Sequence, residues 1–155
     1  MYDGGQSPVI GELSREEIDS ILARNHVGRI GYARANRIDI RPVHYVYSDG
    51  WIYGRTSHGE KFDVLSGSAY QWWPVVFEVD EVEELYRWRS VLVHGGFYVL
   101  SREGTASDHQ TWQNALDILR TLVPAALRAD DPLPLRTILF RIAVQEAAGR
   151  EAIPG

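Results

Sequence analysis

A cluster of cations and hydroxyls in the first half of the chain has the residue types that bind phosphate. Arg41 lies in one predicted strand, Arg55, Thr56 and Ser57 lie at the end of the next, and Lys61 follows shortly after. Guanidinium and ammonium groups form charge-assisted hydrogen bonds with phosphate oxygens, and the free amides of a helix N-terminus add donors. Because this stretch reads as a hairpin that leads into a helix, these groups are expected to form one anion site.

The neighbours of these cations indicate what else the ligand carries. Val43, Tyr45 and Tyr53 occupy the same predicted strands, which suggests that the rest of the ligand is flat and apolar. A structural alternative stays open for the cations. Arg41 would then be a solvated strand residue paired with a carboxylate, and Lys61 an exposed lysine on a helix.

Composition restricts the class of protein. The 155 residues fit one domain (1–155, with a Gly-rich flexible lead-in over 1–10), and 45% apolar with 24% charged residues is typical of globular proteins. The absence of cysteine removes disulfides and thiolate metal sites, and it fits a reducing cytoplasm. A net charge of −5 argues against nucleic-acid binding. The five histidines show no metal-ligand spacing, and no apolar stretch is long enough to cross a membrane, so we expect a cytoplasmic protein without a metal.

The elements that position the cluster follow from hydrophobic periodicity and turn signals. A helix over 15–24 is predicted from the Ser14–Glu17 capping box, and a second helix is predicted after a box at Ser107-Asp-His-Gln110. A short helix is also expected over 59–65. The predicted strands cover 29–34, 38–47, 51–56, 74–82, 88–100 (bent at Gly95-Gly96) and 137–146. Sequential strands with few helices between them indicate a mainly β fold, a closed antiparallel barrel of six strands with flanking helices.

Several fragments, in their order and spacing, resemble one known family. They are Val27-Gly-Arg-Ile-Gly31, Pro42-Val-His-Tyr45, Asp49-Gly-Trp-Ile-Tyr53, Gly59-Glu-Lys61, Val76-Phe-Glu-Val-Asp80 and Trp88-Arg-Ser-Val91. Together they resemble the pyridoxamine 5'-phosphate oxidase-like flavin-binding split barrels, and most of all the branch of nitroimidazole-resistance proteins. The resemblance implies a six-stranded split barrel, a homodimer, and two flavin mononucleotide (FMN) molecules bound between the subunits.

The resemblance also assigns roles to individual residues. Arg41 and Lys61 match the family's phosphate ligands, and the backbone at Pro42 would face the edge of the flavin ring. Val43 would pack on the ring, with ordinary barrel core as its alternative. His44 would bond a ring oxygen or substrate, although a lone strand histidine is more often structural.

Two further groups complete the implied cofactor site. Tyr53, Arg55, Thr56 and Ser57 end the third strand, and the two hydroxyls would donate to phosphate or ribityl oxygens. Arg55 departs from the family, where nitroimidazole-type relatives often carry histidine. The remaining pair approaches from another strand and consists of Trp88 and Ser90. For Trp88 the alternative is packing in the core or at the dimer interface.

The resemblance implies an FMN-dependent oxidoreductase acting on a small molecule. In such a protein the flavin carries the hydride or electron transfer and the protein supplies binding and orientation, so no catalytic acid or base need stand out. Two alternatives stay open. One is a non-catalytic flavin-binding or flavin-sensing protein, and the other is the same cleft filled by deazaflavin F420 or haem. A true pyridoxamine phosphate oxidase is less expected because the family's C-terminal substrate segment is not recognisable.

Overall fold

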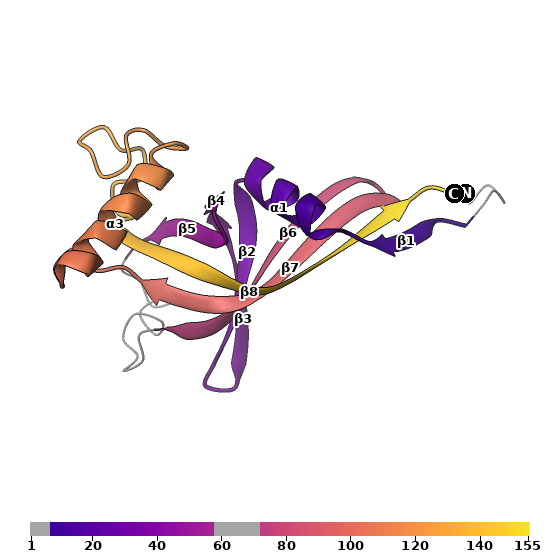
Figure 1. Ribbon diagram of the computed structural model, residues 1–155, viewed down its shortest axis with the longest axis horizontal. Coiled ribbons are helices and arrows are strands. Elements are labelled where there is room, and N and C mark those ends of the chain that lie inside the picture. Colours follow the sequence, from indigo (N-terminus) through magenta and orange to yellow (C-terminus); the bar gives the residue numbers. More distant parts are fainter. Residues whose placement is uncertain (1–6, 58–71) are drawn as a thin grey trace.

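A single curled antiparallel sheet dominates the computed structural model, which describes residues 7–57 and 72–155 (Figure 1). Two helices flank it among these residues, α1 (Arg15–Arg24) and α3 (Ala106–Leu119). The strands are β1 (Val9–Glu12), β2 (Val27–Arg34), β3 (Arg37–His44), β4 (Val46–Ser48), β5 (Trp51–Thr56), β6 (Trp73–Glu84), β7 (Arg87–Val99) and β8 (Ile138–Ile153).

Local sequence signals account for most of these elements. Ser14 accepts from the Glu17 amide while the Glu17 carboxylate accepts from the Ser14 amide, so the predicted capping box of α1 is confirmed. Ala35 and Asn36 both have positive φ in the tight turn between β2 and β3. Such turns match the right-handed twist of the strands they join, which explains why this hairpin forms where the sequence predicted it.

The strand order of the sheet is β3-β2-β6-β7-β8-β5-β4, with β1 added to the far end of β8. The prediction of a mainly β, antiparallel fold with flanking helices is confirmed. The described residues form eight strands rather than six, because the strand expected over 38–47 breaks at Tyr45 and because β1 forms from the supposed lead-in. The sheet is also open rather than closed: β3 and β5 approach one another without pairing, which is the split of a split barrel.

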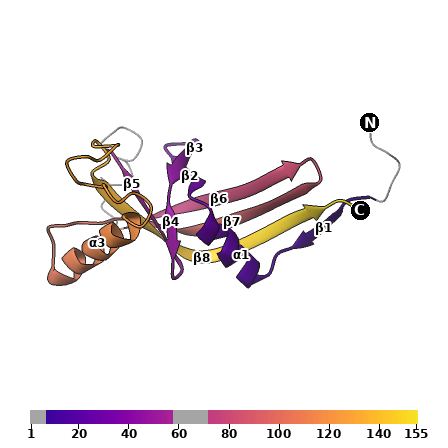
Figure 2. The same cartoon turned by 90° about the horizontal axis from the view of Figure 1, so that it is seen from above.

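Two apolar clusters lie on opposite faces of the curled sheet. The barrel cluster fills the concave side and includes the fully buried Phe77, Phe97 and Phe140. The α3 cluster lies between the helix and the outer side of β5 and β8, where Trp112 and Leu116 pack on residues of the sheet. Figures 1 and 2 both place α3 at one end of the molecule, and the tip of the β6–β7 hairpin with β1 at the other.

Other boundaries differ from the sequence predictions. Val9 and Ile10 belong to β1, so the lead-in is not irregular at these residues. The second capping box is not at 107–110. Thr105 is the N-cap of α3 and Asp108 its N3 partner, since an aspartate reaches back to the N-cap amide as a glutamate does. β8 continues to residue 153, because its far half pairs with β7 and β1.

The sequence predicted a bend at the glycine pair, and the structure has a register shift there. It falls between His94 and Gly95 on the β7–β8 ladder. A Cβ at Gly95 would collide with the Ala143 carbonyl, so this close approach of two backbones requires glycine. The helix predicted over 59–65 lies outside the described residues.

Candidate functional site

The side chain of Arg41 faces the barrel interior from an edge strand. Arg41 pairs with Ile30 of β2, which is fully buried in the barrel cluster, and alternate residues of a strand share a face. Arg41 is half-buried, and its Nε is buried with no hydrogen-bond partner among the described residues. A buried guanidinium nitrogen without an acceptor is costly, so this atom fits a site that takes an anion.

Val43 and Thr56 also face the barrel side of the sheet. Val43 lies two residues beyond Arg41 and packs against the barrel cluster. Thr56 has the same parity as Ile52 and Gly54, and a Cβ at Gly54 would strike the Phe140 ring inside the barrel. Within the described part of the chain, the Thr56 hydroxyl makes one long bond of 3.5 Å, to the Ser57 carbonyl. Arg41, Val43 and Thr56 therefore share one side of the sheet, on the two strands that border the split.

Tyr53 and Arg55 face the opposite side of β5. Tyr53 is buried in the α3 cluster. Both terminal nitrogens of Arg55 donate to the carboxylate of Asp131, with Nη2 to Oδ1 at 2.9 Å, and the two side chains are only 8% and 2% exposed. The guanidinium is thus occupied by a carboxylate of the same chain. The structure does not bring these two residues together with Arg41, and their cofactor contacts stay predictions.

Asp131 is the residue that sequence reasoning missed. The hydrogen bonds from Arg55 hold the pKa of this carboxyl well below its usual range, with further bonds from the amides of Leu133 and Leu127, against the opposing effect of burial. The sequence showed only a proline-containing loop at this point. Its partner lies 76 positions away, and no local signal reports such a pair.

Pro42 and His44 lie on the outer face of the sheet and are exposed. They share this face with Ile38 and Ile40, which are 87% and 66% exposed. Pro42 lies in β3, which is an edge strand of the sheet, where a proline is tolerated. Within one chain neither side chain is on the side of Arg41.

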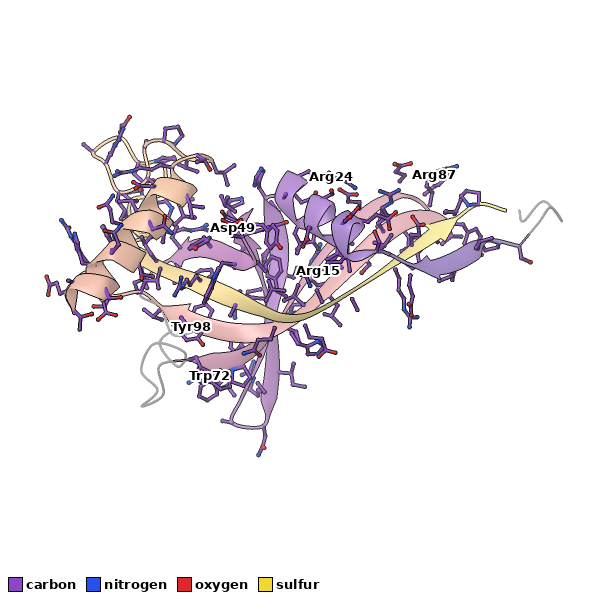
Figure 3. The ribbon with its side chains drawn as sticks, viewed as in Figure 1. Arg15, Arg24, Asp49, Trp72, Arg87 and Tyr98 are labelled. Carbon is purple, nitrogen blue, oxygen red and sulfur yellow. The ribbon has the colours of Figure 1, made fainter. Side chains whose placement is uncertain are left out.

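Trp88 and Ser90 lie in β7 near its hairpin with β6, opposite Val82 and Asp80. Their neighbour Arg87 is at the far end of the molecule from α3 (Figure 3). The sheet thus keeps both residues away from Arg41 within one chain. Lys61, the other predicted phosphate ligand, is outside the described residues.

The described residues hold neither a group of acidic, histidine or cysteine side chains fit for a metal ion nor a helix that could span a membrane. A second unpartnered guanidinium nitrogen is present at Arg141. Its Nε is buried without an acceptor, and its guanidinium lies 3.7 Å from the centre of the Trp51 ring. The stacking on Trp51 provides this arginine with an interaction that Arg41 lacks in the described structure.

Comparison with known proteins agrees with the resemblance. The family described as pyridoxamine 5'-phosphate oxidase matches residues 14–151, so the chain belongs to this family. An uncharacterized protein from Rhizobium meliloti is 25% identical over 153 residues, which cover 92% of this chain and 95% of the relative.

Solved structures show the same fold. An FAD-binding protein from Mesorhizobium loti superposes with a TM-score of 0.70 at 24% identity, covering 96% of this chain and all of the other. A candidate 5-nitroimidazole antibiotic resistance protein from Bacteroides thetaiotaomicron gives a TM-score of 0.69 at 16% identity, covering 95% of this chain and 90% of the other.

Proposed function

We propose that this protein binds FMN and is an FMN-dependent oxidoreductase of a small molecule. The observation that carries the proposal is the buried, unpartnered Nε of Arg41 beside the split of the barrel. Membership of the family supports a flavin as the ligand that carries the anionic phosphate, and the FAD-binding structural relative is consistent with a flavin.

The residues fit a phosphate at one end of the ligand. Arg41 would donate to phosphate oxygens, with the Thr56 and Ser57 hydroxyls as further donors and Lys61 as a second cation. Val43 provides apolar surface next to Arg41. When bound, FMN would supply the hydride or electron transfer, and the chain would bind it, orient it and keep its phosphate neutralised.

We propose further that the protein is a homodimer with the flavin between subunits. Exposed Ile38 and Ile40 form an apolar row on the outer face of β3, and Val27 lies on the same face of β2. Exposed apolar groups of this kind commonly mark a protein interface. Such a dimer would let Trp88 and Ser90 of the partner subunit approach the site, which one chain alone does not allow. The cysteine-free sequence fits a cytoplasmic enzyme.

The deciding experiment is the visible spectrum of the purified protein, with the heat-released cofactor identified by mass. Release of FMN supports the proposal, and release of FAD corrects the cofactor. A colourless protein that also refuses added FMN contradicts it, and F420 and haem are then the ligands to titrate. Turnover with NADH or NADPH and small acceptors separates an enzyme from a non-catalytic flavin-binding protein.

A matched pair of variants tests the assignment of Arg41. Arg41→Gln should weaken FMN binding about tenfold, because a hydrogen bond to a charged group contributes ~1.5–3 kcal/mol. Arg37→Gln on the same side of the same strand is the control, since its side chain is 80% exposed and pairs only with Asp39. Equal FMN affinities for the two variants would show that Arg41 does not bind the phosphate.

A further inference from the structure

A pocket of about 820 Å³ opens at the α3 end of the molecule and borders the proposed flavin residues at Ile138, which pairs with Thr56. It lies between the end of β7, α3, the loop before β8 and the start of β8. Leu100, Trp112, Leu127 and Ile138 give it apolar walls. This volume falls in the range of small-molecule sites, ~300–1,000 Å³, and no described residue of the proposed flavin site lines it.

One wall of this pocket is fixed by Asp131. Its carboxylate accepts from the amides of Leu127 at 2.8 Å and Leu133 at 2.9 Å, while Arg55 binds it from β5. Leu127 is held with a φ of +60°, a left-handed conformation that is rare for leucine. Such strain persists only where surrounding contacts enforce it, and it occurs preferentially at ligand sites.

The opposite wall is also held in place before any ligand arrives. The Arg102 guanidinium lies 5.1 Å from the centre of the Trp112 ring, and the Arg102 carbonyl lies 3.3 Å from Nδ1 of His109. The Ser101 hydroxyl donates to the Glu103 carbonyl at 3.2 Å. A site with both walls ordered loses little entropy on binding, which favours affinity for a small ligand.

The charges around the pocket favour an anion. Arg55 neutralises Asp131, which leaves Arg102 and Arg128 at the rim against Glu103. This excess of positive charge is local, because the whole chain carries a net charge of −5. An anion entering with an apolar body would leave its charge at the rim and bury the rest among the aliphatic side chains.

The surroundings of the Trp112 ring indicate whether the apolar part of the ligand is a flat ring or an aliphatic chain. Trp112 is only 8% exposed, and its ring is already contacted by Arg102 and stacked with His109 at 6.4 Å between centroids. Trp112 is the aromatic residue among the described lining residues, and the other apolar ones are aliphatic. We propose that this pocket is a second ligand site that binds an aliphatic carboxylate, with its carboxyl group at Arg102 and Arg128 and its chain against Leu127 and Ile138.

Calorimetric titration with decanoate and with decanol tests this site on the whole protein. The two probes share their chain and differ in the charged group, so decanoate should bind at least tenfold more tightly. Replacing both rim arginines, Arg102→Gln with Arg128→Gln, should remove that preference. The matched control replaces two exposed arginines elsewhere, Arg15→Gln with Arg87→Gln, and should retain it.

A second variant tests the location independently of charge. Thr137 is exposed at the pocket, so Thr137→Trp should fill it and abolish decanoate binding without lowering the melting temperature. Equal binding of decanol, unchanged binding in both pocket variants, or displacement of decanoate by FMN would each overturn the proposal. The first two outcomes do not depend on whether the protein carries a flavin.

Discussion

Arg41 and Arg55 lie on the two strands that border the split, yet the structure uses them differently. Arg41 faces the barrel side, and its buried Nε has no acceptor among the described residues. Arg55 faces α3, and both its terminal nitrogens bond to Asp131. The sequence suggested one ligand for both. A strand arginine therefore takes its role from the groups that its side chain contacts.

The energetic reason is the cost of burying a charge. A buried guanidinium needs a partner, because desolvation is repaid only by good hydrogen bonds and an opposite charge. Arg55 has such a partner within its own chain, so it needs no ligand. The Nε of Arg41 has no such partner among the described residues, and a bound phosphate would provide one.

The largest expected effect is on the Arg55 side. Asp131→Asn should lower the free energy of unfolding by ~3–5 kcal/mol, because it leaves a buried guanidinium without its counter-charge. Urea unfolding measures this, with Asp130→Asn, an exposed neighbour, as the control. The FMN affinity of the folded variant should not change. A stable variant with altered FMN affinity would instead assign Arg55 to the ligand.

The next effect is on the Arg41 side and concerns binding rather than stability. Replacing Arg41 and Lys61 together by glutamine should weaken FMN binding at least tenfold, since each charge-assisted phosphate bond contributes ~1.5–3 kcal/mol. The melting temperature without FMN should be unchanged or higher, because the buried Arg41 Nε, which has no acceptor among the described residues, has been removed. Fluorescence titration with FMN measures the affinity, and an unchanged dissociation constant would contradict the phosphate assignment.

A smaller loss of stability is expected from a change on the α3 side, and it should leave FMN binding on the barrel side unchanged. Thr105 caps α3 through a bond of 3.1 Å from the Asp108 amide. Thr105→Ala should cost about 1 kcal/mol of stability and leave FMN affinity unchanged, because α3 packs on the face of β5 opposite Thr56. Chemical denaturation and flavin titration of this variant give both quantities. A loss of FMN affinity would mean that the two faces of β5 are coupled.

The smallest effect concerns a third arginine, which is more exposed. Hydrogen bonding from Arg24 and Asn25 lowers the pKa of Glu81 to about 2 from an ordinary value of 4.5, against an opposing effect of burial. Since the unfolded chain binds the proton first, this contribution to stability is complete above pH 4.5 and disappears as pH falls towards 2. Glu81→Gln should reduce the acid-induced loss of stability in that window, measured by urea unfolding at several pH values. A variant with the wild-type pH dependence would exclude Glu81 as a source of that loss.

Much of the fold was predictable because its signals are local. The α1 capping box, the tight turn at Ala35-Asn36 and the glycine kink in β7 all depend on residues close in sequence. The break at Tyr45 was not predictable in this way. The Tyr45 hydroxyl donates to the Leu22 carbonyl at 2.7 Å, and the Tyr45 amide to that of His26, so contacts with distant residues interrupt the strand.

The candidate site was predictable in composition but not in arrangement. Once one residue of a strand is assigned to a face, the alternation of side chains assigns all the others. Which face of β5 is turned to the barrel, however, depends on where Phe140 lies, and the sequence does not show that. The Asp131 partner of Arg55 was equally hidden, since it comes from a loop distant in sequence. The residues that the sequence grouped as one site are therefore distributed over both faces of the sheet.

The position of β8 in the sheet has a consequence for how this protein is made. β8 pairs with β7, β5 and β1, so one backbone edge of each of the three stays unpaired until residues 138–153 are synthesised. At about 5–20 residues per second on the ribosome, β5 pairs only with β4 for several seconds before β8 exists. The β3-β2-β6-β7 part of the sheet can pair earlier, whereas β1 and the β4–β5 hairpin can join it only through β8. The nascent chain is a natural client for chaperones, and its folding rate should be limited by long-range pairing.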